Sequence, residues 1–272
     1  CLNYFDGMFS FAIWDNKKNE LFCARDRFGE KPFFYTKYNS KFIFASEIKA
    51  IAATGIPVTP CYKSILNYLL YGTIRNPNKA KNSSTFYENI IELEPAHYLL
   101  IKNTGDISDP IKYWDLDVNK KTKLNFEDCL DKFDHLLYES TKRRLRSDVS
   151  VGSSLSGGLD SSTIVYNISK IRDNNHSQTT FSARFKGSSV DEGRYMNAVI
   201  ESLPNIKAHF GWYDYDLITN NIDKVFDCQE GPFGSPSILV QNEIMKLARK
   251  ENVKVLLDGQ GADEYLGGYH YF

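Results

Sequence analysis

The segment Ser156-Gly-Gly-Leu-Asp-Ser-Ser162 is the most informative stretch of the chain. It follows the segment 149–155, which we expect to be a strand. It precedes an amphipathic segment whose apolar positions, spaced as on one helix face, are Ile164, Val165, Ile168 and Ile171. Two glycines let the backbone bend sharply and approach a ligand, and a helix start favours an anion. The order strand, glycine loop, helix therefore predicts a phosphate-binding loop.

The elements around this loop predict an α/β fold. Strands at 179–185, 206–210 and 253–257 alternate with helices at 191–202 and 241–250, which is typical of a doubly wound parallel sheet. The first half is instead mainly antiparallel. Its expected strands are 7–15, 20–25, 33–36, 42–45, 90–93 and 97–101. Its expected helices are 48–53 and 59–70, with a polar loop at 76–84. A polar stretch at 112–122 is the predicted linker.

A second glycine-rich loop, Asp258-Gly-Gln-Gly-Ala-Asp-Glu264, follows the last predicted strand. Carboxyl ends of parallel strands share one edge of a sheet, where ligands bind. We therefore expect Asp160 and Asp263 to meet on one Mg²⁺ beside ATP, since a carboxylate facing phosphate alone would be repelled. A plain glycine turn with a capping residue is the alternative for the first loop. A solvated helix start is the alternative for Asp263 and Glu264.

These motifs resemble the glutamine-hydrolysing asparagine synthetase family and its amidotransferase relatives. The two glycine-rich loops resemble the synthetase domain of that family. Three earlier segments resemble the late part of its class II glutaminase domain: Gly7-Met-Phe-Ser-Phe-Ala-Ile-Trp-Asp15, Ala24-Arg-Asp-Arg-Phe-Gly-Glu-Lys-Pro-Phe-Phe-Tyr35 and Phe44-Ala-Ser-Glu-Ile-Lys-Ala50. The resemblance implies an α+β part of an Ntn-type glutaminase sandwich in 1–115. It implies a PP-loop ATP-pyrophosphatase domain, with a doubly wound sheet, in 116–272.

The family resemblance also implies a reaction and its site. Mg-ATP activates a carboxylate as an acyl-adenylate with release of pyrophosphate, and ammonia derived from glutamine attacks the acyl carbon. The implied metal ligands are Asp160 and Asp263. The ATP and pyrophosphate site implied by the motifs comprises Ser154, Leu155, Ser156, Gly157, Gly158, Leu159, Asp160, Ser161, Ser162, Asp258 and Gly259. In that site Leu155, strand 179–185 and Asp258 with Gly259 are expected to face the adenosine.

Two positions depart from the family pattern. Gln260 stands at the catalytic position of the second loop, where asparagine-forming members carry an acid, and a neutral amide cannot act as a general base. The resemblance implies asparagine synthesis from aspartate, whereas Gln260 favours the alternative of another acceptor, such as the carboxylate of a cell-surface sugar. Cys1 lies only six residues before Gly7, so it aligns with an interior position; we expect a small buried residue and no glutaminase nucleophile.

Composition excludes several classes of function. The net charge of −1 gives no drive toward nucleic acid or anionic membrane, and no apolar run reaches the length of a membrane span. The basic run Lys142-Arg-Arg144 is interpreted as a helix end. Five cysteines without a C-x-x-C pair indicate free thiols in a reducing, cytoplasmic setting. The first residue is not Met and the chain stops after a glycine-rich loop, so we expect an inactive piece of a longer protein.

Three hypotheses follow. The first is an ATP-dependent carboxylate amidotransferase with small-molecule partners (glutamine, aspartate or another carboxylate, and ATP), and a homodimer stays open. The second is another PP-loop enzyme, such as a GMP synthetase, an NAD synthetase or a tRNA-thiolation enzyme; these share S-G-G-x-D-S but lack the upstream glutaminase-like segments. The third is a non-catalytic nucleotide-binding domain. The pair Asp160 and Asp263 argues against loss of catalysis.

Overall fold

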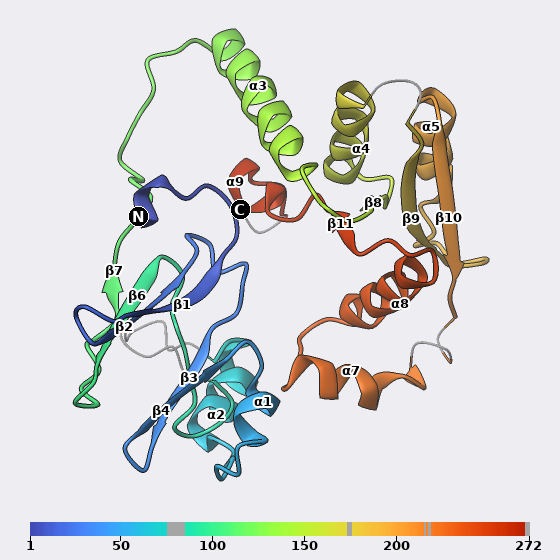
Figure 1. Cartoon of the computed structure of the whole chain (residues 1–272). Coiled ribbons are helices and arrows are strands. Elements are labelled where there is room, and N and C mark those ends of the chain that lie inside the picture. Colours follow the sequence, from blue (N-terminus) through green and yellow to red (C-terminus); the bar gives the residue numbers. More distant parts are fainter. Residues whose placement is uncertain (75–84, 173–175, 215, 217–218, 270–272) are drawn as a thin grey trace. The chain divides into compact units, whose positions relative to one another are not determined.

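The computed structural model describes residues 1–74, 85–172, 176–214, 216 and 219–269, so the loop predicted at 76–84 lies outside the described residues. The chain divides into two compact units, which are drawn together in Figure 1. Unit 1 consists of Cys1–Lys121 and Gln229–Gly234; unit 2 consists of Thr122–Cys228 and Ser235–Phe272.

Unit 1 is built on two antiparallel sheets, as its alternating apolar pattern predicts. One sheet has the order β1 (Ser10–Asp15), β2 (Glu20–Arg25), β6 (His97–Lys102) and β7 (Ile111–Lys112). The other has the order β4 (Lys41–Ala45), β3 (Phe34–Tyr38) and β5 (Ile91–Glu92). Side chains from both sheets form one core cluster, because alternate residues of each strand point inward. That cluster contains Cys23, Phe33, Tyr35, Leu93, Leu99 and Ile101.

The helices of unit 1 are short, and one begins later than the sequence pattern predicts. They are η1 (Leu2–Tyr4), α1 (Ile48–Ala52) and α2 (Tyr62–Tyr71). Pro60 forms a β-bridge with Tyr87 and the Cys61 N–H donates to the Phe86 carbonyl, so α2 begins only at Tyr62. The expectation that Cys1 is buried is wrong: it precedes η1 and is exposed, and Leu2 is the buried residue of that turn.

The segment Gln229–Gly234 belongs to unit 1 although its neighbours in sequence belong to unit 2. The Glu230 carboxylate accepts hydrogen bonds from the N–H groups of Ile48 (2.8 Å) and Lys49 (2.6 Å). These are N–H groups of the first turn of α1, which have no partner within the helix. Glu230 therefore acts as the cap that Glu47, the residue preceding α1, does not supply.

Unit 2 contains the parallel sheet that the strand–helix alternation predicts. Its order is β10 (Ile206–Trp212), β9 (Gln178–Arg184), β8 (Val151–Ser154) and β11 (Val255–Leu257), and every pair is parallel. Across the sheet, the strands are therefore the third, second, first and fourth of this unit in chain order. The direction of winding therefore reverses between β8 and β11, and a crevice for a ligand is expected at the carboxyl ends of these two strands.

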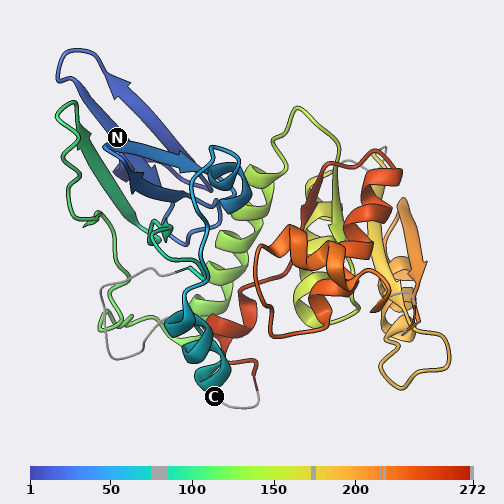
Figure 2. The same cartoon turned by 90° about the horizontal axis from the view of Figure 1, so that it is seen from below.

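Helices cover both faces of this sheet (Figures 1 and 2). The helices are α3 (Phe126–Arg144), α4 (Leu159–Ile171), α5 (Gly193–Ser202), α7 (Ile222–Gln229), α8 (Ser237–Lys250) and α9 (Ala262–Leu266). On β9, Phe181 packs against Ile244 and Ala248 of α8. Phe210 of β10, which points to the opposite face, joins the cluster of Leu155, Val165 and Met196 under α4 and α5.

Helices α7 and α9 were not predicted from the sequence, and α5 begins later than predicted. Neither α7 nor α9 has a sufficiently long apolar repeat; α9 covers five residues between Gly261 and Gly267, which both have positive φ. The helix predicted from Asp191 begins at Gly193, and Asp191 lies before it with its carboxylate bound to Arg184. The basic residues Lys142 to Arg144 lie in the last turn of α3, as interpreted from sequence.

Candidate functional site

The loop Ser156–Ser162 joins the end of β8 to the first turn of α4. Gly157 has φ +88°, a value that L side chains rarely adopt. Gly158 is the residue that precedes α4, and it supplies no side-chain cap. The N–H groups of the first turn of α4 therefore have neither an intrahelical partner nor a side-chain cap from this residue. Such a turn is a ready anion-binding site.

Hydroxyl groups of the same loop surround these backbone donors. Ser156 Oγ and Ser161 Oγ lie 2.9 Å apart, the Gly158 N–H donates to Ser156 Oγ, and Ser161 Oγ donates to the Gly158 carbonyl. Ser162 Oγ is buried and has no hydrogen-bond partner in the part of the chain that the structure describes. A buried hydroxyl without a partner is costly, so a ligand acceptor at this place would stabilise the loop.

The second glycine-rich loop lies against this turn. A Cβ placed on Gly259 would lie 2.8 Å from Asp160 Cβ and 2.9 Å from Ser161 N. Only glycine permits this approach, because the neighbouring atoms include backbone. The structure thus brings together the two loops that the sequence placed at the carboxyl ends of β8 and β11.

The contact between the loops gathers carboxylates. Burial, followed by the charges of Asp263 and Glu264, raises the pKa of the Asp160 carboxyl. The Gly268 N–H donates to the Asp263 carbonyl at 3.0 Å, and the Tyr269 hydroxyl donates to Glu264 at 2.9 Å. Mutual repulsion of these carboxylates is relieved by a cation.

The carboxylates of Asp160 and Asp263 fit a Mg²⁺ ion whose remaining ligands would be water and substrate oxygens. Among the described residues, no group of three or more His, Cys, Asp or Glu side chains is arranged to hold a metal ion. Mg²⁺ normally uses one or two protein carboxylates and completes its shell with water and substrate phosphates. Asp160 and Asp263 provide such a pair of oxygen donors.

The remaining predicted site residues differ in exposure. Gln260 and Asp258 are exposed, and Leu159 is 87% exposed. Ser154 is the last residue of β8 and pairs with Phe181. Leu155 is 1% exposed and packs in the core, its N–H donates to the Phe181 carbonyl, and its carbonyl accepts from Ser182 Oγ. Its expected contact with adenosine stays a prediction.

Sequence analysis missed Tyr195 and Met196, which lie behind the first loop. A Cβ on Gly157 would lie 2.8 Å from Tyr195 Cβ and 3.0 Å from Met196 N, both in the first turn of α5. Arg184 lies against the start of the same helix, at Gly193. An arginine at the carboxyl end of a predicted strand, followed seven residues later by Asp191, was the available signal.

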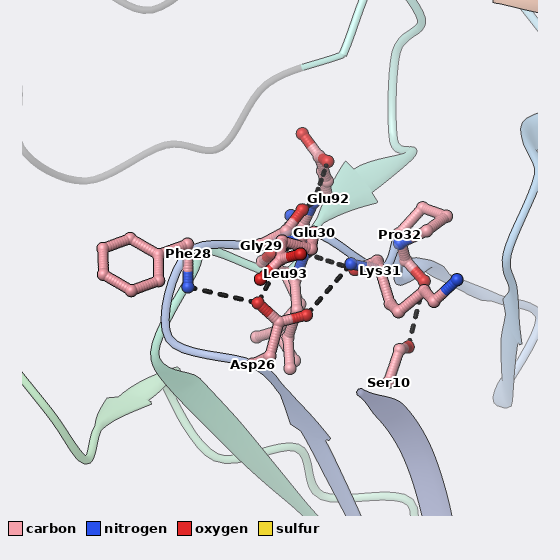
Figure 3. A network of polar contacts seen from close by, with 10 residues as sticks. Ser10, Asp26, Phe28, Gly29, Glu30, Lys31, Pro32, Glu92 and Leu93 are labelled. Carbon is pink, nitrogen blue, oxygen red and sulfur yellow. Dashed lines mark hydrogen bonds and ion pairs between the residues drawn. The ribbon is translucent and has the colours of Figure 1, made fainter. Parts of the chain in front are cut away.

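Unit 1 contains a buried polar network in the loop after β2 (Figure 3). The Asp26 carboxylate, 1% exposed, accepts from the N–H groups of Phe28, Glu30 and Lys31 at 2.9–3.1 Å and from Phe9 at 3.3 Å. Arg25 donates to the carbonyls of Gly29, Lys31 and Leu93 and pairs with Glu92 at 2.8 Å. The motif Arg-Asp-Arg-Phe-Gly at 25–29 therefore builds a rigid loop.

Replacing Asp26 by Asn is expected to destabilise unit 1 by about 2 kcal/mol, because an amide satisfies fewer of these buried N–H groups. Urea denaturation followed by circular dichroism measures the change. Asp15→Asn is the matched control, since Asp15 caps only the exposed turn at Lys17 and Lys18. Equal losses in the two variants would contradict a special role for the buried network.

Two family models match the chain. The asparagine synthase model matches residues 132–272, which is more than half of the chain, and the glutamine amidotransferase domain model matches residues 1–114. A putative glutamine-hydrolysing asparagine synthetase 2 of Methanocaldococcus jannaschii is 34% identical over 99% of this chain and 51% of its own length. The chain belongs to the glutamine-hydrolysing asparagine synthetase family.

A second member of the asparagine synthetase family, glutamine-hydrolysing asparagine synthetase 2 of Bacillus subtilis, is 34% identical over 97% of this chain and 36% of its own length. The chain thus spans about half or less of the length of these relatives. Among solved structures, a glutamine-dependent NAD⁺ synthetase from Acinetobacter baumannii in complex with adenosine diphosphate covers 96% of this chain and 61% of its own, with 11% identity and a TM-score of 0.37. Every helix among the described residues is too short or too polar to cross a bilayer.

Proposed function

We propose that the protein containing this chain is an ATP-dependent amidotransferase. Residues 116–272 bind ATP and activate a carboxylate, and residues 1–115 belong to the part that releases ammonia from glutamine. The observation that carries this proposal is the close approach of Gly259 to Asp160. That contact places two glycine-rich loops and the acidic group Asp160, Asp263 and Glu264 at one edge of the sheet.

The residues of the first loop suit binding of pyrophosphate. The N–H groups at the start of α4, together with the hydroxyls of Ser156, Ser161 and Ser162, supply donors to phosphate oxygens. Ser162 gains the partner that it lacks among the described residues. In the proposed reaction a substrate carboxylate oxygen attacks the α-phosphorus of ATP and the bond to pyrophosphate breaks. Ammonia then attacks the acyl carbon, AMP leaves with the electron pair of the broken carbon–oxygen bond, and the nitrogen releases one proton to solvent.

Asp160 and Asp263 are the proposed ligands of Mg²⁺, which when bound neutralises charge on the departing phosphates. The proposed nucleotide site is completed by Ser154, Leu155, Leu159, Asp258 and Gly259. Gln260, exposed in the second loop, is proposed to face the acceptor. Because Gln260 is neutral, it orients a substrate by hydrogen bonds and does not remove a proton. The five free thiols of the chain suit a reducing cytoplasm.

The names of the relatives favour aspartate as the acceptor and asparagine as the product. The second candidate is another carboxylate, such as one on a cell-surface sugar, and Gln260 is the observation that favours it. A third candidate is nucleotide binding without catalysis.

ATP–pyrophosphate exchange by the full-length protein, with Mg²⁺ and a panel of carboxylates, separates these candidates. We expect exchange that depends on Mg²⁺ and is stimulated by aspartate. Exchange with another acid alone would assign a different acceptor. Absence of exchange with every acid, together with measurable ATP binding, would replace the enzyme proposal by the nucleotide-binding one.

A further inference from the structure

Arg184 stands at the carboxyl end of β9 and is held by a bidentate ion pair. Its Nε lies 2.9 Å from Asp191 Oδ1, and its Nη2 lies 2.9 Å from Asp191 Oδ2. The two side chains are only 16% and 19% exposed. The Asp191 carboxylate also accepts from the Phe185 N–H at 3.0 Å. The Arg184 hydrogen bond, followed by that of Phe185, lowers the pKa of Asp191 to about 2, so the pair stays charged at neutral pH.

Aromatic rings fix the plane of the same guanidinium. Arg184 Cζ lies 4.6 Å from the centre of the Trp212 ring and 5.5 Å from that of Phe210, both on the neighbouring strand β10. Arginine prefers such stacking because its planar cation is attracted by the face of a ring. Ion pair and rings together give the guanidinium a single defined position.

That position lies against the beginning of α5. A Cβ on Gly193, the first residue of α5, would lie 2.0 Å from Arg184 Cζ and from Arg184 Nη2. The guanidinium therefore packs directly against the start of α5, and a side chain at position 193 would displace it. Asp191 also has a hydrogen bond from the Gly193 backbone, so both members of the ion pair contact the first turn of α5.

The first turn of α5 packs against Gly157 of the phosphate loop. Tyr195 and Met196 are the residues that a Cβ on Gly157 would meet, at 2.8 Å and 3.0 Å. Met196 is 3% exposed and packs with Leu155, the residue that enters the loop. A displacement of this turn would therefore remove the packing that holds Gly157 in its conformation with φ +88°.

We propose that Arg184 and Asp191 are a positioning pair for the pyrophosphate loop. They hold the first turn of α5 against Gly157, and so hold the loop in the shape that receives the phosphates. This role rests on the proposed function. Neither residue is assigned a contact with ATP. Their effect is on how well the loop is organised before ATP arrives.

The variants Arg184→Lys and Asp191→Asn test this role in the full-length protein. Lysine keeps the charge but loses the planar fork, and asparagine keeps the shape but loses the charge. We expect the KM for ATP in pyrophosphate exchange to rise about 10-fold in either variant, as is usual when a group that orients binding residues is lost. The double variant should show little further loss, since both residues act through one interaction. Lys246→Gln, which removes an exposed ion pair with Glu243 on α8, is the matched control.

Hydrogen–deuterium exchange of residues 156–162 gives a readout that needs no activity. Faster exchange in this segment in both variants, but not in the Lys246 control, is the expected result. Unchanged exchange there, with a lowered melting temperature, would show a merely structural pair and overturn the inference. If the wild-type protein shows no pyrophosphate exchange, the proposed function fails, but the deuterium result still decides whether the pair positions the loop.

Discussion

Asp160→Asn in the full-length protein is expected to lower ATP–pyrophosphate exchange by about 100-fold or more, the usual loss when a group that stabilises transition-state charge is removed. Asp263→Asn should act similarly. An asparagine oxygen is a weaker ligand for Mg²⁺ than a carboxylate, so saturation with Mg²⁺ should restore little activity. Asp131→Asn is the control, because Asp131 is an exposed carboxylate on α3 of the same unit. Retention of exchange by the Asp160 variant would contradict the proposed metal site.

The same substitution is expected to leave stability unchanged, or to increase it, when Mg²⁺ is absent. The pKa of Asp160 is raised in the folded protein by burial and then by Asp263 and Glu264. A raised carboxyl pKa means that the contribution of Asp160 to stability is present below its ordinary pKa of 3.8 and is lost as pH rises through the folded value. At neutral pH the ionised group is therefore unfavourable, and asparagine relieves it.

Thermal melting at pH 7 with and without Mg²⁺ measures both effects. We expect Mg²⁺ to raise the melting temperature of the wild-type protein and not that of Asp160→Asn. A variant that melts lower than wild type without Mg²⁺ would show instead that Asp160 stabilises the fold as an anion.

The fold class follows from local sequence patterns, whereas several boundaries depend on contacts far along the chain. The alternation of strands and helices in unit 2 is visible locally, and it correctly indicates a parallel sheet. The late start of α2 depends on Pro60 and Tyr87, which lie on different segments. Asp191, which precedes α5, pairs with Arg184 at the end of β9, and no local propensity for helix encodes that pair.

The site shows the same division. That the two glycine-rich loops meet could be predicted, because the carboxyl ends of parallel strands share an edge. That β8 and β11 are adjacent, and that Gly259 lies directly on Asp160, depends on strand order. The residues missed by sequence analysis, Tyr195 and Met196, belong to no ligand motif. They act only by packing behind Gly157.

Gly157→Ala is expected to cost about 3 kcal/mol of stability, since strain at a positive φ and overpacking each contribute roughly 1–3 kcal/mol. The new methyl group would lie 2.8 Å from Tyr195 Cβ and 3.0 Å from the Met196 backbone nitrogen, and backbone cannot move aside cheaply. Chemical denaturation without ligand measures this loss, so the result does not depend on which substrate the protein uses.

Gly158→Ala is the matched control for this prediction, one residue further along the same loop. Gly158 has φ −71°, which any residue adopts, and the nearest atom to a Cβ there is Ser156 Oγ at 3.4 Å. Alanine at this helix-start position should cost only about 0.5 kcal/mol. Equal losses of unfolding free energy in the two variants would mean that stability depends on the general flexibility of the loop and not on the packing of Gly157. A loss confined to Gly157 would mean that the loop is held in one shape by the turn of α5 behind it, which is the condition for a preorganised phosphate site.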